Sequence, residues 1–124
     1  MGTPAMPPGI RDFKAYLPAK DFELSKQFYR ALGFTESPGW GGTADFELNG
    51  HRFRLQNYYG PDWANNFMVV ISVDDVEGWH RHVQQMADSG NFGSMRIKPP
   101  ETVDDQYLVL HVIDPSGVLL VFVQ

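Results

Sequence analysis

The sequence ends on DPSGVLLVFVQ (residues 114–124), a four-residue turn followed by an almost unbroken run of apolar side chains. Within residues 114–117, Asp, Pro and Gly stand where a type I turn favours them. Residues 106–113 and 118–123 on either side are therefore predicted to pair as an antiparallel hairpin. A last strand this apolar is expected to lie inside a sheet that a helix covers on one face.

Upstream of the hairpin, the sequence predicts one strand and one helix. Residues 67–73 are predicted to form the strand, and Asp74-Asp75 begin the helix. The side chains that recur at helical spacing on its apolar face are Val76, Trp79, Val83 and Met86. Residues 88–94 (DSGNFGS) end the helix, a short strand is expected at residues 95–98, and Pro99-Pro100 are expected to bar regular structure.

The first half of the chain repeats this order. A short strand is predicted at residues 13–17 and is stopped by Pro18, after which Asp21 caps a helix that ends at Gly33. Further strands are predicted at residues 34–37, 43–48 and 51–58, with a loop at residues 38–42 and a tight hairpin turn at Asn49-Gly50.

The predicted fold class is α+β, with two βαβββ modules in one domain. The modules span residues 13–58 and 67–124, a linker covers residues 59–66, and residues 1–12 are predicted to be a flexible tail. Each module has one helix to cover one face of its sheet, so the opposite face needs a partner or a ligand. Two such curved half-barrels facing each other would enclose a cavity.

The composition excludes several classes of function. The net charge of −5 is spread along 124 residues without a basic stripe, so nucleic acid is not an expected partner. Cysteine is absent, which excludes disulfides and thiolate sites. The longest apolar run, residues 118–123, is far shorter than the roughly 20 residues that span a bilayer, and no membrane association is expected. We expect a cytoplasmic protein.

Four segments together resemble the glyoxalase/bleomycin-resistance group of the vicinal oxygen chelate superfamily. They are KDFELSKQFYRALGF (residues 20–34), YYGPDWANNF (58–67), VDDVEGWHRHV (73–83) and DPSGVLLVF (114–122). The resemblance implies the glyoxalase/bleomycin resistance/dihydroxybiphenyl dioxygenase fold. It also implies a homodimer in which a module of one chain faces a module of the other, and, in the metal-dependent members, a divalent ion held by four strands.

The resemblance also shows which residues stand at the family's metal-ligand positions. They are Lys14, Met68, Arg54 (or Gln56 with a one-residue slip) and Val121, where a metal-dependent member has glutamate. A protonated ammonium cannot coordinate a cation, and one weak amide oxygen would not make a site among the other three. We therefore expect neither a metal nor another cofactor.

Strand alternation predicts the lining of the cavity. The residues expected to point inward are Lys14, Tyr16, Arg52, Arg54, Gln56, Tyr58, Met68, Val70 and Ser72, with Leu119 and Val121 from the last strand. Those expected under the helices are Phe13, Ala15, Leu17, Phe53, Leu55, Val69, Ile71, Leu120 and Phe122. The three inward cations favour an anionic ligand, although a solvated arginine face is an equal alternative.

The remaining candidates are one tryptophan and the histidines. Trp63 either packs at the junction of the modules or of the dimer, or closes the cavity as a lid. His80 and His82 are two residues apart on a helix and cannot share a metal, while His51 follows a turn. If His111 faces the cavity, it is the one plausible general base.

The first hypothesis is therefore a metal-free protein, like the bleomycin-resistance proteins, that binds an amphiphilic or anionic small molecule in a dimer cavity. The alternative is a glyoxalase-like lyase or isomerase, or a dioxygenase, with an atypical metal site. A structural or regulatory dimer whose cavity is filled by its own side chains is the third.

Overall fold

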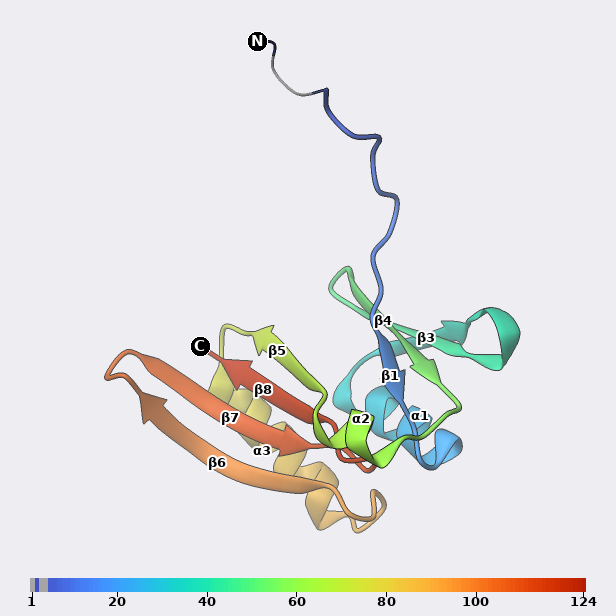
Figure 1. The fold of residues 1–124 in the computed structure, drawn as a ribbon. Helices are drawn as coiled ribbons and strands as arrows, with labels where there is room; N and C mark the ends of the chain where they lie inside the picture. Colours follow the sequence, from blue (N-terminus) through green and yellow to red (C-terminus); the bar gives the residue numbers. More distant parts are fainter. Residues whose placement is uncertain (1, 3–4) are drawn as a thin grey trace.

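Two open four-stranded sheets, one from each half of the chain, make up the fold in the computed structural model, which describes residue 2 and residues 5–124 (Figure 1). The first sheet has the order β1-β4-β3-β2, with β1 (Tyr16–Pro18), β2 (Thr35–Pro38), β3 (Ala44–Leu48) and β4 (His51–Gln56). The second has the order β5-β8-β7-β6, with β5 (Met68–Ser72), β6 (Arg96–Val103), β7 (Tyr107–Ile113) and β8 (Leu119–Val123). In both, the first strand runs parallel to the fourth, so the prediction of paired βαβββ modules is confirmed.

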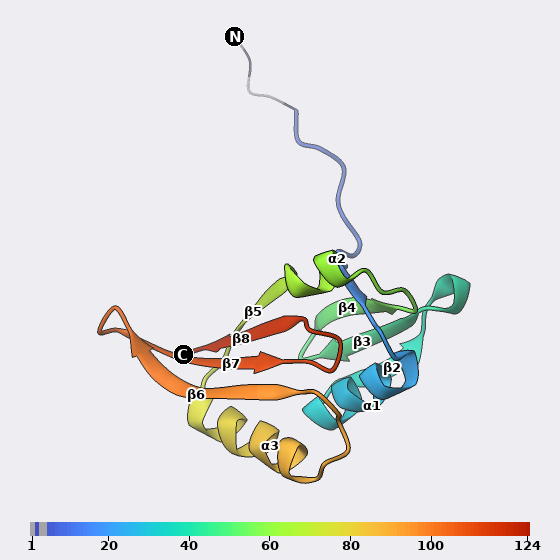
Figure 2. The same cartoon turned by 60° about the horizontal axis from the view of Figure 1, so that its bottom comes forward.

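One long helix covers each sheet, and both begin at the predicted aspartate. The Asp21 side chain caps α1 (Phe22–Leu32) by accepting from the Leu24 N–H at 3.1 Å, and Asp75 caps α3 (Val76–Asp88) by accepting from the Gly78 N–H at 2.9 Å. Each carboxylate satisfies a backbone donor that the first turn would leave free. Figure 2 shows the two helices on the same side of the molecule.

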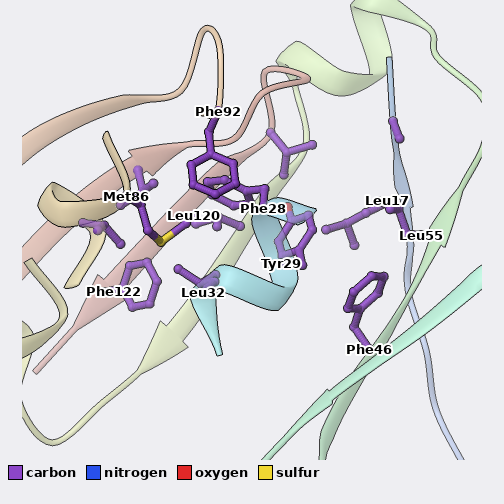
Figure 3. Close-up of a cluster of buried hydrophobic side chains, with 14 of the residues drawn as sticks. Leu17, Phe28, Tyr29, Leu32, Phe46, Leu55, Met86, Phe92, Leu120 and Phe122 are labelled. Carbon is purple, nitrogen blue, oxygen red and sulfur yellow. The ribbon is translucent and has the colours of Figure 1, made fainter. Parts of the chain in front are cut away.

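The two halves share one core, on the helix-covered faces of both sheets. Figure 3 shows Phe28 and Leu32 of α1 beside Leu120 and Phe122 of β8. All four side chains are 2 % exposed or less, and the Phe28 ring also meets Phe92 edge-on at 5.9 Å. Because the modules pack through these faces, their other faces remain open.

A buried polar contact joins the halves within this core. The Tyr29 hydroxyl on α1 donates to Asp114 Oδ2 at 2.5 Å, and Asp114 Oδ1 accepts from the N–H groups of Ser116 at 2.8 Å and Val118 at 3.0 Å. Asp114 is 0 % exposed and Tyr29 1 % exposed. Burial raises the pKa of the Asp114 carboxyl and, more strongly, that of the Tyr29 phenol. The turn of DPSG thus fixes the β7–β8 hairpin against the other module.

The last glycine of that turn is required by both conformation and space. Gly117 has a φ of 102°, and a Cβ atom at this residue would lie 2.8 Å from Asn65 Oδ1. Asn65 ends the short helix α2 (Pro61–Asn65), which lies in the predicted linker. A larger residue would therefore strain the backbone and require the Asn65 side chain to move.

The prediction that Pro99-Pro100 bar regular structure is wrong. Both lie within β6, where Lys98 pairs with His111 and Glu101 pairs with Val109. Between these two pairs the chain advances three residues along β6 but only two along β7. One extra residue in this step is a β-bulge. Proline is tolerated because β6 is an edge strand, whose outer N–H groups have no ladder partner.

The first strand is shorter than predicted. It begins at Tyr16, Phe13 is 84 % exposed and Ala15 is also exposed, so the prediction that Phe13 and Ala15 pack under a helix is wrong. The core beneath β1 begins only at Leu17. A single turn of 3-10 helix, η1 (Trp40–Gly42), occupies the predicted loop.

The amino-terminal segment leaves the body of the molecule in Figures 1 and 2. Residues 1, 3 and 4 of the predicted tail lie outside the described residues, and no helix or strand is present in residues 5–15. The large apolar side chains Met6 and Ile10 are 90 % and 78 % exposed. None of the described helices is both long and apolar enough to span a bilayer.

Candidate functional site

The candidate site is the open face of each sheet, opposite the helices. In the first sheet, the strand register places Tyr16 next to Arg54, and Arg54 next to Asp45. Tyr16 is 37 % exposed, whereas its neighbour Leu17 is 2 % exposed. Because side chains alternate along a strand, Tyr16, Arg54 and Asp45 share the open face.

Asp45 is the centre of a polar cluster on this face. Arg54 holds it with two hydrogen bonds, from Nε at 2.6 Å and from Nη2 at 3.0 Å, and Lys14 Nζ lies 3.1 Å from Oδ2. The hydrogen bonds from Arg54, with those from Lys14, hold the pKa of the Asp45 carboxyl below its usual value. Asp45 is not among the residues predicted from strand alternation, although counting back from the Asn49-Gly50 turn places it opposite Arg54.

Carboxylates pair with each of the three cations that had favoured an anionic ligand. Besides Asp45, Asp12 lies 2.9 Å from Lys14, and Glu47 lies 2.7 Å from Arg52. Three cations thus face three carboxylates, and the face carries no excess positive charge. The basis for expecting an anion at this face is therefore lost.

Aromatic side chains border the polar cluster. Trp40, 74 % exposed, donates from Nε1 to the Tyr16 hydroxyl at 3.3 Å, and Arg54 Nη1 donates to the same oxygen at 3.3 Å. The pKa of the Tyr16 phenol is lowered, chiefly by Arg54 and then by Trp40. The face therefore combines hydrogen-bonding groups with exposed rings.

The predicted ligand-binding residues Gln56, Tyr58 and Trp63 lie at the end of β4 and in the segment that follows it. Gln56 pairs with Pro18 of β1. Tyr58, 59 % exposed, has its ring 6.1 Å from that of Trp63 on α2, which also meets Phe67 edge-on at 6.2 Å. Trp63 thus lies in the linker, between the ring of Tyr58 and that of Phe67.

The open face of the second sheet is mainly apolar. The register forms one row from Val70 through Val121 and His111 to Lys98. Val70 is 62 % exposed and the neighbouring Met68 59 %, while Val121 is 9 % exposed. His111 therefore lies on the same face as Val121, which is the position that a role as general base in the cavity requires. Its Nδ1 atom is buried without a hydrogen-bond partner in the described part of the chain.

The family's metal-ligand positions do not fit a divalent cation here. Lys14 is held in ion pairs whose carboxylates, Asp12 first, raise the pKa of its ammonium, and a protonated ammonium has no lone pair to offer. Arg54 is likewise engaged, and Met68 and Val121 supply a thioether and an alkyl group. Among residue 2 and residues 5–124, no three His, Cys, Asp or Glu side chains gather as a ligand set.

A cavity of the single chain lies elsewhere, at the junction of the modules. Its volume is about 750 Å³, and its walls include Leu32 and Phe53 of the first module and Val69, Ile71 and Trp79 of the second. None of the eight predicted ligand-binding residues lines it. Of the other residues expected to point into the ligand cavity, Arg52, Val70 and Ser72 do line it.

Comparison with known families gives one match over most of the chain. The family model described as Glyoxalase/Bleomycin resistance protein/Dioxygenase superfamily matches residues 13–122. A comparison with curated proteins gives no match.

Solved structures similar to this chain include a bleomycin-binding protein in complex with bleomycin, which is 23% identical with a TM-score of 0.75, covering 93% of this chain and 98% of that one. A bleomycin resistance determinant encoded on the transposon Tn5 is 22% identical with a TM-score of 0.75 and the same coverage. The lactoylglutathione lyase of Agrobacterium tumefaciens is 14% identical with a TM-score of 0.66, covering 94% of each chain. At these identities the likeness shows the fold.

Proposed function

Because the chain belongs to the Glyoxalase/Bleomycin resistance protein/Dioxygenase superfamily, we propose that it is a metal-free protein that binds an amphiphilic small molecule. The ligand lies between the open face of the first sheet in one copy and the open face of the second sheet in another. The observation that carries this proposal is the contrast between these faces, one lined by the Asp45 cluster and the other by Met68 and Val70.

The apolar face supports the proposal because water contacts it in the single chain. Met68 and Val70 are more than half exposed on adjacent positions of one face of β5, and Val121 lies beside Val70 on β8. Contiguous apolar surface of this kind marks a binding or association site. A ligand with one apolar and one hydrogen-bonding side matches the two facing sheets.

The packing of the two sheets within one chain supports a homodimer. The two modules pack through the helix-covered faces and share one core, which leaves both open faces without a partner. Met6, Ile10 and Phe13 on the amino-terminal segment are also exposed. A second copy would cover apolar surface that a single chain leaves in water.

Bleomycin is the natural first probe, since the bleomycin-binding neighbour was solved in complex with it. We expect bleomycin to change the fluorescence of Trp40, which is 74 % exposed and hydrogen-bonded to Tyr16 on the open face. Prior treatment with EDTA should leave the titration unchanged, because the proposed site holds no metal. Trp40→Phe is the control that assigns the signal to this indole among the three tryptophans.

An enzyme assay separates the proposal from the glyoxalase alternative. The substrate is the hemithioacetal of methylglyoxal and glutathione, with and without added divalent metal. The proposal expects no turnover in either condition. Turnover that depends on the added metal would instead establish the lyase alternative.

A further inference from the structure

A second pocket of about 580 Å³ lies where loops of both modules meet. Its walls come from four segments: the residues before α1, those before α2, the loop that leads into β6, and the β7–β8 turn. The wall residues include Lys20, Tyr59, Met95, Arg96, Ile113 and Ser116. None of the eight residues assigned to the proposed ligand cavity lines it.

Two free cations distinguish this pocket. The chain has ten lysines and arginines, and seven of them form ion pairs with carboxylates in the described residues: Lys14, Lys26, Arg30, Arg52, Arg54, Arg81 and Lys98. Of the other three, Lys20 and Arg96 line this one pocket, and Arg11 lies on the amino-terminal segment. In a chain with a net charge of −5, the unpaired positive charge is therefore concentrated here.

The only carboxyl group among the wall residues, that of Asp114, forms no ion pair with either cation in the described part of the chain. Asp114 is 0 % exposed and accepts from Tyr29, Ser116 and Val118. The Lys20 ammonium lies 5.6 Å from the centre of the Tyr59 ring. Neither cation of the pocket thus forms an ion pair within residue 2 and residues 5–124.

The other walls provide surface for an organic group. Met95 and Ile113 are partly buried apolar side chains, and the half-buried Tyr59 adds an aromatic face and a hydroxyl that has no hydrogen-bond partner among the described residues. Arginine and lysine recognise carboxylates and phosphates by charge-assisted hydrogen bonds. We propose that this pocket binds a small organic anion, with a carboxylate or phosphate between Lys20 and Arg96 and an apolar or aromatic body against Met95, Ile113 and Tyr59. By the strand register, Arg96 and Ile113 stand in the row of Met68, so the pocket adjoins the open face of the second sheet.

Binding here would also reinforce the junction of the modules. The Lys20 N–H donates to Ser116 Oγ at 2.9 Å, and Ser116 Oγ lies 3.2 Å from Ser25 Oγ on α1. The anion therefore contacts residues that already connect the first module to the β7–β8 turn. Since a ligand that binds only the folded state stabilises it, the melting temperature should rise with anion concentration.

The test uses calorimetric and NMR titrations of the full chain with benzoate, phenyl phosphate and inorganic phosphate, with benzylamine as a cation of similar shape. We expect at least one of the two aromatic anions to bind and to shift the amide resonances of Gly93, Ser94 and Gly117, whereas benzylamine does not. Benzoate and phenyl phosphate distinguish a carboxylate site from a phosphate site. Inorganic phosphate shows how much affinity the charge alone provides.

Three variants complete the test. Lys20→Gln and Arg96→Gln should each weaken binding of the aromatic anion about tenfold or more, the usual loss for one charged hydrogen bond. Arg11→Gln removes the third unpaired cation and should leave binding unchanged. The proposal is wrong if neither aromatic anion binds at millimolar concentration, or if Arg11→Gln weakens binding as much as the other two. Because Lys20 and Arg96 are exposed, melting curves without ligand should show all three variants folded.

Discussion

Replacing Asp114 by alanine should lower the free energy of unfolding by about 3–5 kcal/mol, because it leaves three buried donors without an acceptor. These are the Tyr29 hydroxyl and the N–H groups of Ser116 and Val118, all bonded to a carboxyl group that is 0 % exposed. The loss is large because Asp114 stabilises both the turn and its contact with the other module. Chemical denaturation followed by circular dichroism measures it.

Two milder variants separate these roles. Asp114→Asn keeps the size and one carbonyl oxygen for the turn N–H groups, so we expect it to lose less than half as much stability as Asp114→Ala. Tyr29→Phe removes only the hydroxyl that reaches from α1 to Oδ2 and should cost about 1–3 kcal/mol. Equal and small losses in all three variants would show that this contact does not hold the modules together.

The Asp114→Asn variant also gives the pH dependence of the contact. Burial raises the pKa of Asp114 above its value in the unfolded chain, so between the two values the folded state binds the extra proton. The contribution of Asp114 to the free energy of unfolding is then greatest below its pKa in the unfolded chain. This contribution decreases as the pH rises through its pKa in the folded protein. The stability of wild type relative to Asp114→Asn should therefore fall with increasing pH across this window.

Val70→Asp should weaken association of two copies about a hundredfold or more, while the single chain remains folded. Val70 is 62 % exposed in one chain, so a carboxylate is solvated there. If a second copy covers this face, the same carboxylate is buried without a partner, and a loss of about 3 kcal/mol corresponds to a hundredfold. Sedimentation velocity over a range of concentrations reports the change.

Val103→Asp is the matched control for this substitution. Val103 lies in the same sheet, is 37 % exposed and pairs with Tyr107 at the far end of the β6–β7 hairpin, away from β5 and β8. Val103 shares the open face but lies far from Met68 and Val70, so we expect Val103→Asp to weaken association much less than Val70→Asp. An equal effect of both substitutions would count against the face of Met68 and Val70 as the contact surface.

Local chemistry made much of the fold predictable from the sequence. The aspartate caps at Asp21 and Asp75, the Asn49-Gly50 turn and the DPSG turn each depend on residues that are neighbours in the chain. Alternation along strands also placed Tyr16 and Arg54 on the open face. The same local rules would have found Asp45, since a two-residue turn fixes the register of its hairpin.

What the sequence could not provide depends on contacts between distant segments. Tyr29 and Asp114 are 85 residues apart, and nothing local predicts their hydrogen bond. Pro99-Pro100 were expected to prevent pairing because the position of β6 at the sheet edge follows only from the strand order. Likewise, Lys14 and Arg54 suggested an anion site in the sequence, but in the structure both side chains form ion pairs with Asp45.

Native mass spectrometry of freshly purified protein can test whether this chain is a metal-free dimer that binds a small molecule, because it reports the oligomer, bound metal and retained small molecule together. We predict a dimer whose mass contains no metal ion and which gains mass in steps of one bleomycin molecule when the probe is added. A mass with about one divalent metal ion per chain, removable by chelator and restored with lyase activity, would show a metal enzyme instead. A monomer that binds no probe would rule out the proposed dimer cavity.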